Sequence, residues 1–427
     1  MRLLIPLLFF MCPFANRAAS LPHNFHDLIQ YALDNSPHTR LHSAEVDIRK
    51  AESQSIDRER IIPQLTLSAS YQNWTYKRPY DTGSGLINNN GQNPTIGITL
   101  AYDLQKLFGP ESDVAGKNLY YTQIDQRLAK RNLVRQLKYS FFTIKEMNSE
   151  ITRMETVQKL FNKINQILEK QRKNGVNNQI DRRQFKVQQD MIQSELQSRK
   201  TDLDLEYSTL SDLTQIPIES LQNIIQNTAT SPSLLYAQNE NLNKKILQLQ
   251  NNQDLYKSLT RDYDTSKAEY DGYTSLPLPS LFLTYSHESP TMRSADGPQS
   301  MTEIGLSWPI DAFFKRTQEK SVLSAKVIRN KVALDSILFK YRTEIETTAK
   351  TLHRAKEQSL TLDQTEKESK KLLDDSFHYF AQKRIDTLGT LDIFQKYLDA
   401  SKAHSQNNLQ IQKLDADLEY LLGGQNI

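Results

Sequence analysis

The sequence predicts a mainly α protein with a β contribution, in which long antiparallel coiled-coil helices are joined to four short amphipathic strands. Three observations lead to this prediction. The chain repeats one order of segments twice, four segments alternate apolar and polar residues, and two long stretches, 117–172 and 313–380, contain neither Gly nor Pro. Extended helices explain such stretches better than a compact enzyme does.

The amino-acid composition excludes several classes of protein. The 427 residues include 53 Lys+Arg and 50 Asp+Glu, which gives a formal net charge of +3. Because a dedicated nucleic-acid binder should carry a basic surplus, we expect no nucleic-acid partner. The scarcity of Gly (13) and Pro (15) excludes collagen-like and low-complexity disordered chains. The single Cys12 can form neither an internal disulfide nor a thiolate zinc site.

Residues 1–20 are predicted to be a signal peptide. Arg2 gives a positive start, residues 3–14 are mostly apolar, and Ala18-Ala19-Ser20 supplies small residues for cleavage. The apolar run is too short to cross a bilayer. Lipidation of Cys12 stays open, although the bulky residues before it do not favour it. We therefore expect an exported protein.

Two copies of one pattern make up the rest of the chain. Residues 62–67 (Ile-Pro-Gln-Leu-Thr-Leu) correspond to 278–283 (Leu-Pro-Ser-Leu-Phe-Leu), and 96–99 (Ile-Gly-Ile-Thr) to 304–307 (Ile-Gly-Leu-Ser). Each copy is read as helix, strand, loop, strand and long helical hairpin. The predicted parts are a first repeat 21–213 with strands 63–73 and 95–104 and hairpin 110–213, a connecting segment 214–239, and a second repeat 240–424 with strands 279–287 and 302–311 and hairpin 313–422.

The predicted strands alternate with a period of two. In the first strand Leu65 and Leu67 share one face, and Thr66 and Ser68 share the other. A half-buried sheet in a soluble protein shows the same period. Four such strands in two matched pairs, behind a signal peptide, favour strands that cross a membrane. The residues expected to face lipid are Leu65, Leu67, Tyr71, Ile96, Ile98, Leu100, Tyr102, Leu281, Leu283, Tyr285, Ile304, Leu306 and Trp308.

Four strands cannot close a barrel around a lumen, and open sheet edges are not tolerated in lipid. If these strands lie in a membrane, several chains must therefore share one barrel. The long helices carry apolar residues at steps of three and four, as in Leu137, Phe141 and Ile144, which predicts a coiled-coil seam.

The whole arrangement resembles the TolC-like outer-membrane efflux protein family. Residues 28–37 look like the family's first helix start. Residues 175–181 are similar to its Gly-led periplasmic turn, which has an Asp six residues on. Residues 385–392 match the second turn more loosely, because Lys383 or Arg384 stands where Gly is expected.

The resemblance implies a homotrimer whose four strands per chain form a shared trimeric 12-stranded β-barrel above an α-barrel of twelve helices. It implies an outer-membrane protein extending into the periplasm and in contact with outer-membrane lipid. The family conducts substrate passively for efflux or type I secretion. Its partners are a periplasmic adaptor (membrane fusion) protein and an inner-membrane pump of the RND or ABC type. No enzymatic activity and no cofactor are expected.

The family match also implies site residues. Asp181 and Asp392 are expected at the periplasmic aperture, where a symmetric oligomer would turn each into a ring of carboxylates that gates and selects cations. A solvated carboxylate at a helix end is the alternative for both. The expected adaptor-docking tips are Gly175, Val176, Asn177, Asn178, Arg384, Ile385, Asp386 and Thr387. A helix connection that contacts nothing is the alternative for the tips.

Catalytic and metal chemistry find no support in the sequence. His38 and His42 have the i,i+4 spacing of a helical ligand pair, but no third ligand lies nearby. Phosphate-binding, dinucleotide and zinc-protease signatures are absent. The remaining alternative function is a periplasmic coiled-coil scaffold or adaptor without a membrane-spanning barrel.

Overall fold

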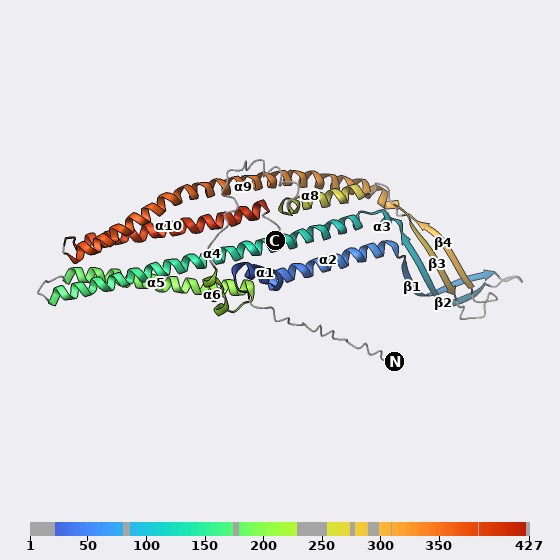
Figure 1. Cartoon of the computed structure of the whole chain (residues 1–427). Coiled ribbons are helices and arrows are strands. Elements are labelled where there is room, and N and C mark those ends of the chain that lie inside the picture. The colour runs from blue at the N-terminus through green and yellow to red at the C-terminus, as the bar shows by residue number, and fades with distance from the viewer. Residues whose placement is uncertain are drawn as a thin grey trace, which may run out of the picture. The chain divides into compact units, whose positions relative to one another are not determined.

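Figure 1 shows the computed structural model of the chain, which describes residues 22–79, 86–173, 179–228, 254–273, 278–288, 299–308, 310–382 and 384–423. The predicted signal peptide lies outside these residues. The chain divides into two compact units, which are described separately below. Unit 1 comprises 1–39, 132–237 and 350–417, and unit 2 comprises 40–131, 238–349 and 418–427.

The described elements are mostly helical, as predicted, with four strands. Their order along the chain is α1 (Phe25–Asn35), α2 (Pro37–Ile61), β1 (Gln64–Pro79), β2 (Leu86–Asp103), α3 (Leu104–Phe108), α4 (Glu111–Lys173), α5 (Gln179–Thr214), α6 (Ile218–Asn227), α8 (Asp254–Gly272), β3 (Ser280–Glu288), β4 (Gln299–Ser307), α9 (Ile310–Ala381) and α10 (Thr387–Leu422). None of the described helices is both long and apolar enough to cross a bilayer.

In unit 1 a first apolar cluster joins α1, α4, α5 and α6. Leu28 of α1, Leu137 of α4, Leu210 of α5 and Leu221 of α6 are each completely buried in it. Asn24 begins α1 by accepting a hydrogen bond from the Asp27 backbone N–H at 2.9 Å, the usual role of an Asn N-cap. Isolated helices as short as α1 and α6 are only marginally stable in water, so both depend on their packing against α4 and α5 in this cluster.

A second cluster in unit 1 packs the α4/α5 hairpin against the α9/α10 hairpin. Phe161 of α4 meets Phe394 of α10 in a T-shaped contact with ring centroids 4.4 Å apart. Phe185 of α5 lies against Phe380 of α9 at 5.8 Å. These rings are 5% exposed or less, so the predicted seam of α4 continues into a four-helix core. Figure 1 shows α5 lying beside α4, and α10 beside α9.

In unit 2 the contact between α4 and α8 is polar. Arg127 donates two hydrogen bonds of 2.9 Å to the carboxylate of Asp254, and Arg131 lies 3.6 Å from it. Burial alone would raise the pKa of Asp254, but the hydrogen bonds and charge of Arg127, with the charge of Arg131, lower it. Nearby, burial and then the hydrogen bond to Asp264 raise the pKa of Tyr121 to about 12, so this phenol remains a donor.

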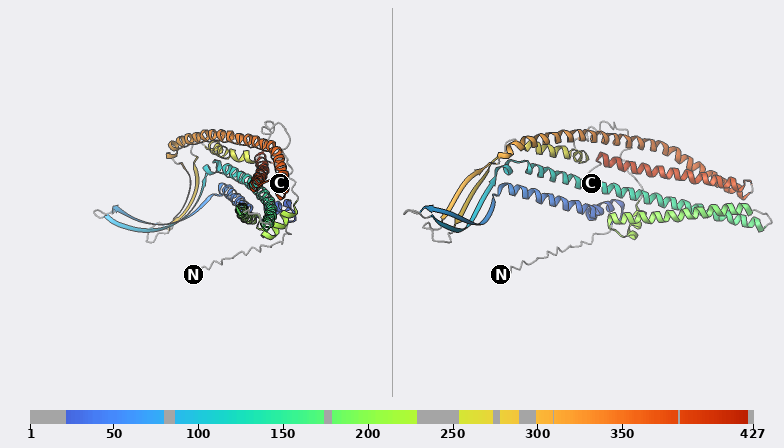
Figure 2. Two further views of the ribbon diagram at one scale, coloured as in Figure 1. Left: turned by 90° about the vertical axis from the view of Figure 1, so that its left-hand side faces the viewer. Right: turned by 180° about the vertical axis from the view of Figure 1, so that it is seen from behind.

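The four strands, all in unit 2, form one antiparallel sheet in the order β1-β2-β3-β4. The register pairs Leu65 with Leu100, Leu100 with Leu283, and Leu283 with Ile304. Apolar residues from both repeats therefore lie side by side in one row. Figure 2 shows the strands running next to one another and curving together.

The strands of the first repeat are longer than predicted. The sequence predicted strands 63–73 and 95–104 joined by a loop, whereas β1 and β2 have 16 and 18 residues and pair as far as Pro79 with Leu86. The Asn- and Gly-rich residues looked like a loop because they disfavour strands, but the backbone ladder does not depend on apolar side chains. Among the described residues, β2 pairs at Pro94 with β1 and not with β3, so one edge of the strand tolerates the missing N–H there.

Other boundaries also differ. The predicted strand 302–311 is wrong at its end, because β4 stops at Ser307 and α9 begins at Ile310; Pro309 has no N–H to donate to a ladder. The segment 214–239, predicted to be a polar connection, contains the amphipathic helix α6. The single helix predicted before the first strand is two, because Pro37 lacks the N–H that would continue α1 and instead starts α2.

Candidate functional site

One face of the sheet is apolar and exposed in the chain. Directly opposed residues in an antiparallel sheet point to the same side. Their exposed fractions include 69% for Leu65 and 76% for Ile304. The rows on this face are Leu65–Leu100–Leu283–Ile304, Leu67–Ile98–Tyr285–Thr302 and Tyr102–Leu281–Leu306. Such a continuous apolar surface needs a nonpolar neighbour.

The opposite face of the same strands is polar. Thr66, Thr99, Thr284 and Glu303 form one row across all four strands. The hydroxyl oxygens of Thr99 and Thr284 are 3.1 Å apart and share a hydrogen bond. A sheet with one apolar and one hydroxyl-bearing face is the pattern of a barrel wall between lipid and water.

Phe282 breaks the alternation, and the register explains how it fits. It lies on the polar face, where its partner in β4 is Gly305. A Cβ added to Gly305 would meet the Phe282 ring at 2.4 Å, so the ring occupies the space left by the absent side chain. The equivalent glycine of the first repeat, Gly97, is also crowded, with a Cβ meeting Ser68 Oγ at 2.9 Å. Close packing rather than a turn accounts for Gly305, whereas at Gly97 the contact is with the end of the Ser68 side chain, which can rotate away.

Not all residues predicted to face lipid lie free on the apolar face. Tyr102 is half-buried, and its hydroxyl donates a 2.9 Å hydrogen bond to the carbonyl of Arg60 in α2. Trp308 is 52% exposed but follows the end of β4, outside the ladder. The side chain of Tyr71 is outside the described residues. The other ten, from Leu65 to Leu306, are exposed on one face.

The second predicted tip begins α10. The carboxylate of Asp386 accepts a 2.8 Å hydrogen bond from the backbone N–H of Gly389, which makes it the cap of this helix. Thr387 is buried, Ile385 is half-buried against the second apolar cluster, and Arg384 is exposed. Only part of this tip is therefore available to a partner.

Of the two residues predicted at the aperture, the structure describes the side chain of Asp392 but not that of Asp181. Asp392 is 63% exposed on α10, and its carboxylate lies 2.7 Å from Lys396 Nζ, one turn further on. Its charge is thus partly balanced within the chain. The side chain of Asp181 and the whole first tip, Gly175, Val176, Asn177 and Asn178, fall outside the described residues.

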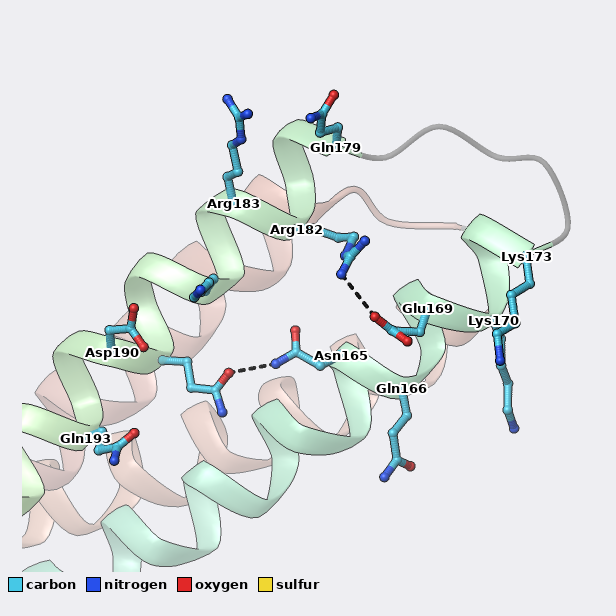
Figure 3. A pocket seen from close by; sticks show the side chains of 12 residues that line it. Asn165, Gln166, Glu169, Lys170, Lys173, Gln179, Arg182, Arg183, Asp190 and Gln193 are labelled. Atoms are coloured by element: carbon cyan, nitrogen blue, oxygen red, sulfur yellow. Dashed lines mark hydrogen bonds and ion pairs between the residues drawn. The ribbon is translucent and has the colours of Figure 1, made fainter.

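Sequence reasoning missed a groove between α4 and α5 near the end of their hairpin. We call it the basic groove; its volume is about 840 Å³. Arg182 crosses it to Glu169 at 3.0 Å, and Asn165 donates a 2.7 Å hydrogen bond to Gln189 (Figure 3). A surplus of Lys and Arg on both sides of the turn was the available signal. The lining residues are Asn165, Gln166, Glu169, Lys170, Lys173, Gln179, Arg182, Arg183, Lys186, Gln189, Asp190 and Gln193.

Among the described residues, no group of three or more His, Cys, Asp or Glu side chains is placed to hold a metal ion. His42 lies 3.7 Å from Glu45 on the same helix, in the i,i+3 geometry of a surface pair.

No family model matches the chain, and no curated protein matches it. Solved structures do. The outer-membrane channel OprN matches 94% of this chain and 90% of its own, with a TM-score of 0.77 at 14% identity. The Campylobacter jejuni CmeC outer membrane channel matches 94% of this chain and 86% of its own, with a TM-score of 0.73 at 14% sequence identity. The outer membrane protein VceC of Vibrio cholerae matches 94% of this chain and 96% of its own, with a TM-score of 0.73 at 14% sequence identity. The chain therefore has the fold of these outer-membrane channels, which confirms the predicted fold class.

Proposed function

We propose that the chain is the outer-membrane exit channel of a tripartite efflux or type I secretion system. In this role it conducts substrate passively, and an inner-membrane pump of the RND or ABC type supplies the energy. A periplasmic adaptor connects the two. The proposal places the chain in the outer membrane after export by its signal peptide, and it assigns the chain no covalent chemistry.

The observation that carries the proposal is the two-sided sheet. Leu and Ile predominate on one face of the four neighbouring strands, and the opposite face carries most of their Thr and Ser residues. A soluble coiled-coil scaffold would have to hide the apolar rows, whereas a membrane-spanning wall needs them. The likeness in fold to outer-membrane channels over 94% of the chain supports the same choice.

The oligomer follows from the sheet edges. In the sheet order β1-β2-β3-β4, the outer edges of β1 and β4 have no partner among the described strands. Because unpaired edges are not tolerated in lipid, we propose that β1 of one chain pairs with β4 of the next. Three copies give the twelve strands expected from the family resemblance, and the barrel then has a lumen lined by the polar rows.

The aperture remains part of the proposal. Asp181 and Asp392 would form carboxylate rings at the periplasmic end, and the tips 175–178 and 384–387 would meet the adaptor. The ion pair of Asp392 with Lys396 reduces the negative charge of the second ring. Removing this lysine should therefore make the ring more selective for cations.

Two experiments test the function. In fractionated cells the chain should stay with outer membranes after a high-salt wash and should be released only by detergent. In a planar bilayer, the purified chain with Asp392→Asn should give ion conductance that exceeds that of the unaltered chain. A chain that washes off with salt, or one that gives no conductance in either form, would exclude the channel.

A further inference from the structure

The two helical hairpins of unit 1 correspond to one another in the repeat, but their ends differ in charge. Residues 161–191, around the first turn, include seven Lys or Arg and three Asp or Glu. Residues 369–399, around the second turn, include five of each. Both hairpins adopt the same antiparallel structure, so the basic surplus of the first is not needed to form it. A surplus of this kind on one end points to a ligand.

The surplus is arranged on both rims of the basic groove. Arg183 and Lys186 lie on α5, and Lys170 and Lys173 lie on α4; all four are exposed. Arg182 reaches from α5 into the groove toward Glu169 (Figure 3). An elongated ligand lying along the groove would therefore meet cations from both helices at once.

The groove does not neutralise these charges itself. Among its described lining residues are five cations and two carboxylates, those of Glu169 and Asp190. Among the described residues of the groove, one ion pair forms, that of Arg182 with Glu169. Like charges held close together repel, and a ligand that carries carboxylates removes this cost while it forms charge-assisted hydrogen bonds.

The remaining lining residues indicate what kind of anion fits. Five amides, among them Gln179 and Gln193, line the groove. An amide side chain both donates and accepts hydrogen bonds, as peptide groups and polar side chains require. A lipid surface would need apolar residues, and a single phosphate would leave most of the 840 Å³ empty. The lining thus fits a carboxylate-bearing protein segment.

A second copy of this chain does not supply such a segment at its other hairpin end, where acidic and basic residues balance. We propose that the basic groove receives a carboxylate-rich segment of the periplasmic partner protein. This inference rests on the proposed function, which places a partner at this end. It gives the two hairpin ends different roles, since only the first selects a partner by charge.

Binding of a probe peptide tests the inference. The full chain, purified in detergent, is titrated into a fluorescent oligo-glutamate peptide, and the dissociation constant is measured by anisotropy at two salt concentrations. The variant Arg183→Glu with Lys186→Glu should weaken binding by about tenfold or more. The matched control, Lys370→Glu with Lys371→Glu in α9, reverses two exposed lysines near the other end and should change binding by less than about twofold.

The result expected for the unaltered chain is binding that weakens at higher salt. Equal weakening by both variants, or by neither, would overturn the assignment to the groove. Equally tight binding to polyphosphate or to phosphatidylglycerol vesicles would overturn the choice of a protein segment. Conductance separates the two proposals: a channel that conducts but does not bind the peptide refutes only the groove, whereas a chain without conductance refutes the proposed function.

Discussion

Placing an arginine on either face of strand β3 tests which face meets lipid. Leu283→Arg puts a charge on the apolar row, between Leu100 and Ile304. The matched control is Thr284→Arg, one residue further along the same strand but on the polar face, where Glu303 lies opposite. Both variants introduce the same side chain into the same backbone, so their difference reports the environment of each face.

The register and strand geometry give the size of the effect. Leu283 is three residues into β3, or about 10 Å along the strand, which at a tilt near 40° is about 8 Å in depth. The apolar band of such a barrel is about 25 Å tall, so Leu283 lies nearly two thirds of the way to its centre. Arginine costs about 2–4 kcal/mol at the centre and less toward the edges, so we expect about 2 kcal/mol per chain for Leu283→Arg. For Thr284→Arg we expect less than about 0.5 kcal/mol, as for a solvated surface substitution.

The assay is unfolding of the barrel by guanidinium after insertion into lipid vesicles, followed by tryptophan fluorescence. Assembly on unheated gels gives a second readout, since a weaker barrel should release monomer at a lower temperature. Equal losses in the two variants would refute the two-sided sheet. A larger loss for Thr284→Arg would reverse the assignment of its faces.

Three further changes have defined outcomes. Acidification from pH 5 to pH 3 should loosen the packing of α8. The pKa of Asp254 is lowered in the folded chain, so its carboxylate contributes stability that is fully present above the unfolded pKa, about 3.9, and is lost as the pH falls through the folded pKa. Amide hydrogen exchange of α8 measures this loss of stability, and Asp254→Asn should remove its dependence on pH. Phe394→Ala should cost about 3–5 kcal/mol in urea unfolding of the hairpin core, and a loss below about 1 kcal/mol would contradict its burial. Gly305→Ala should weaken the sheet because its Cβ meets the ring of Phe282, and Phe282→Leu should restore the stability measured on unheated gels; no loss would disprove the close contact.

Most of the architecture could be predicted, since it depends on local periods in the chain. The apolar spacing of Leu137, Phe141 and Ile144 placed the seam of α4, and these residues are buried. In the first half of α9 the same spacing does not lead to burial, because Ile337 lies four residues before the buried Tyr341 but is 42% exposed. The helical period gives a face, but which residues on it gain a neighbour depends on the helices packed beside them.

The candidate site was less predictable. The strand face from Leu65 to Leu306 could be read from the alternation alone. The sequence led us to expect a docking role for Asp386, but it did not reveal that the carboxylate of Asp386 caps α10. The basic groove was missed because Lys170 and Arg183 lie on different helices, and only the closed hairpin brings them to one groove.

The amino-acid pattern by itself determined that this protein has two matched halves, long helices and four two-faced strands, because repeats and periods of 2 and 3.6 are properties of neighbouring residues. The tertiary structure alone decided the register that aligns Leu65, Leu100, Leu283 and Ile304 in one row, and the fit of Phe282 over Gly305. The row joins strands of the two repeats, and both features are set by packing and backbone pairing that no local pattern encodes.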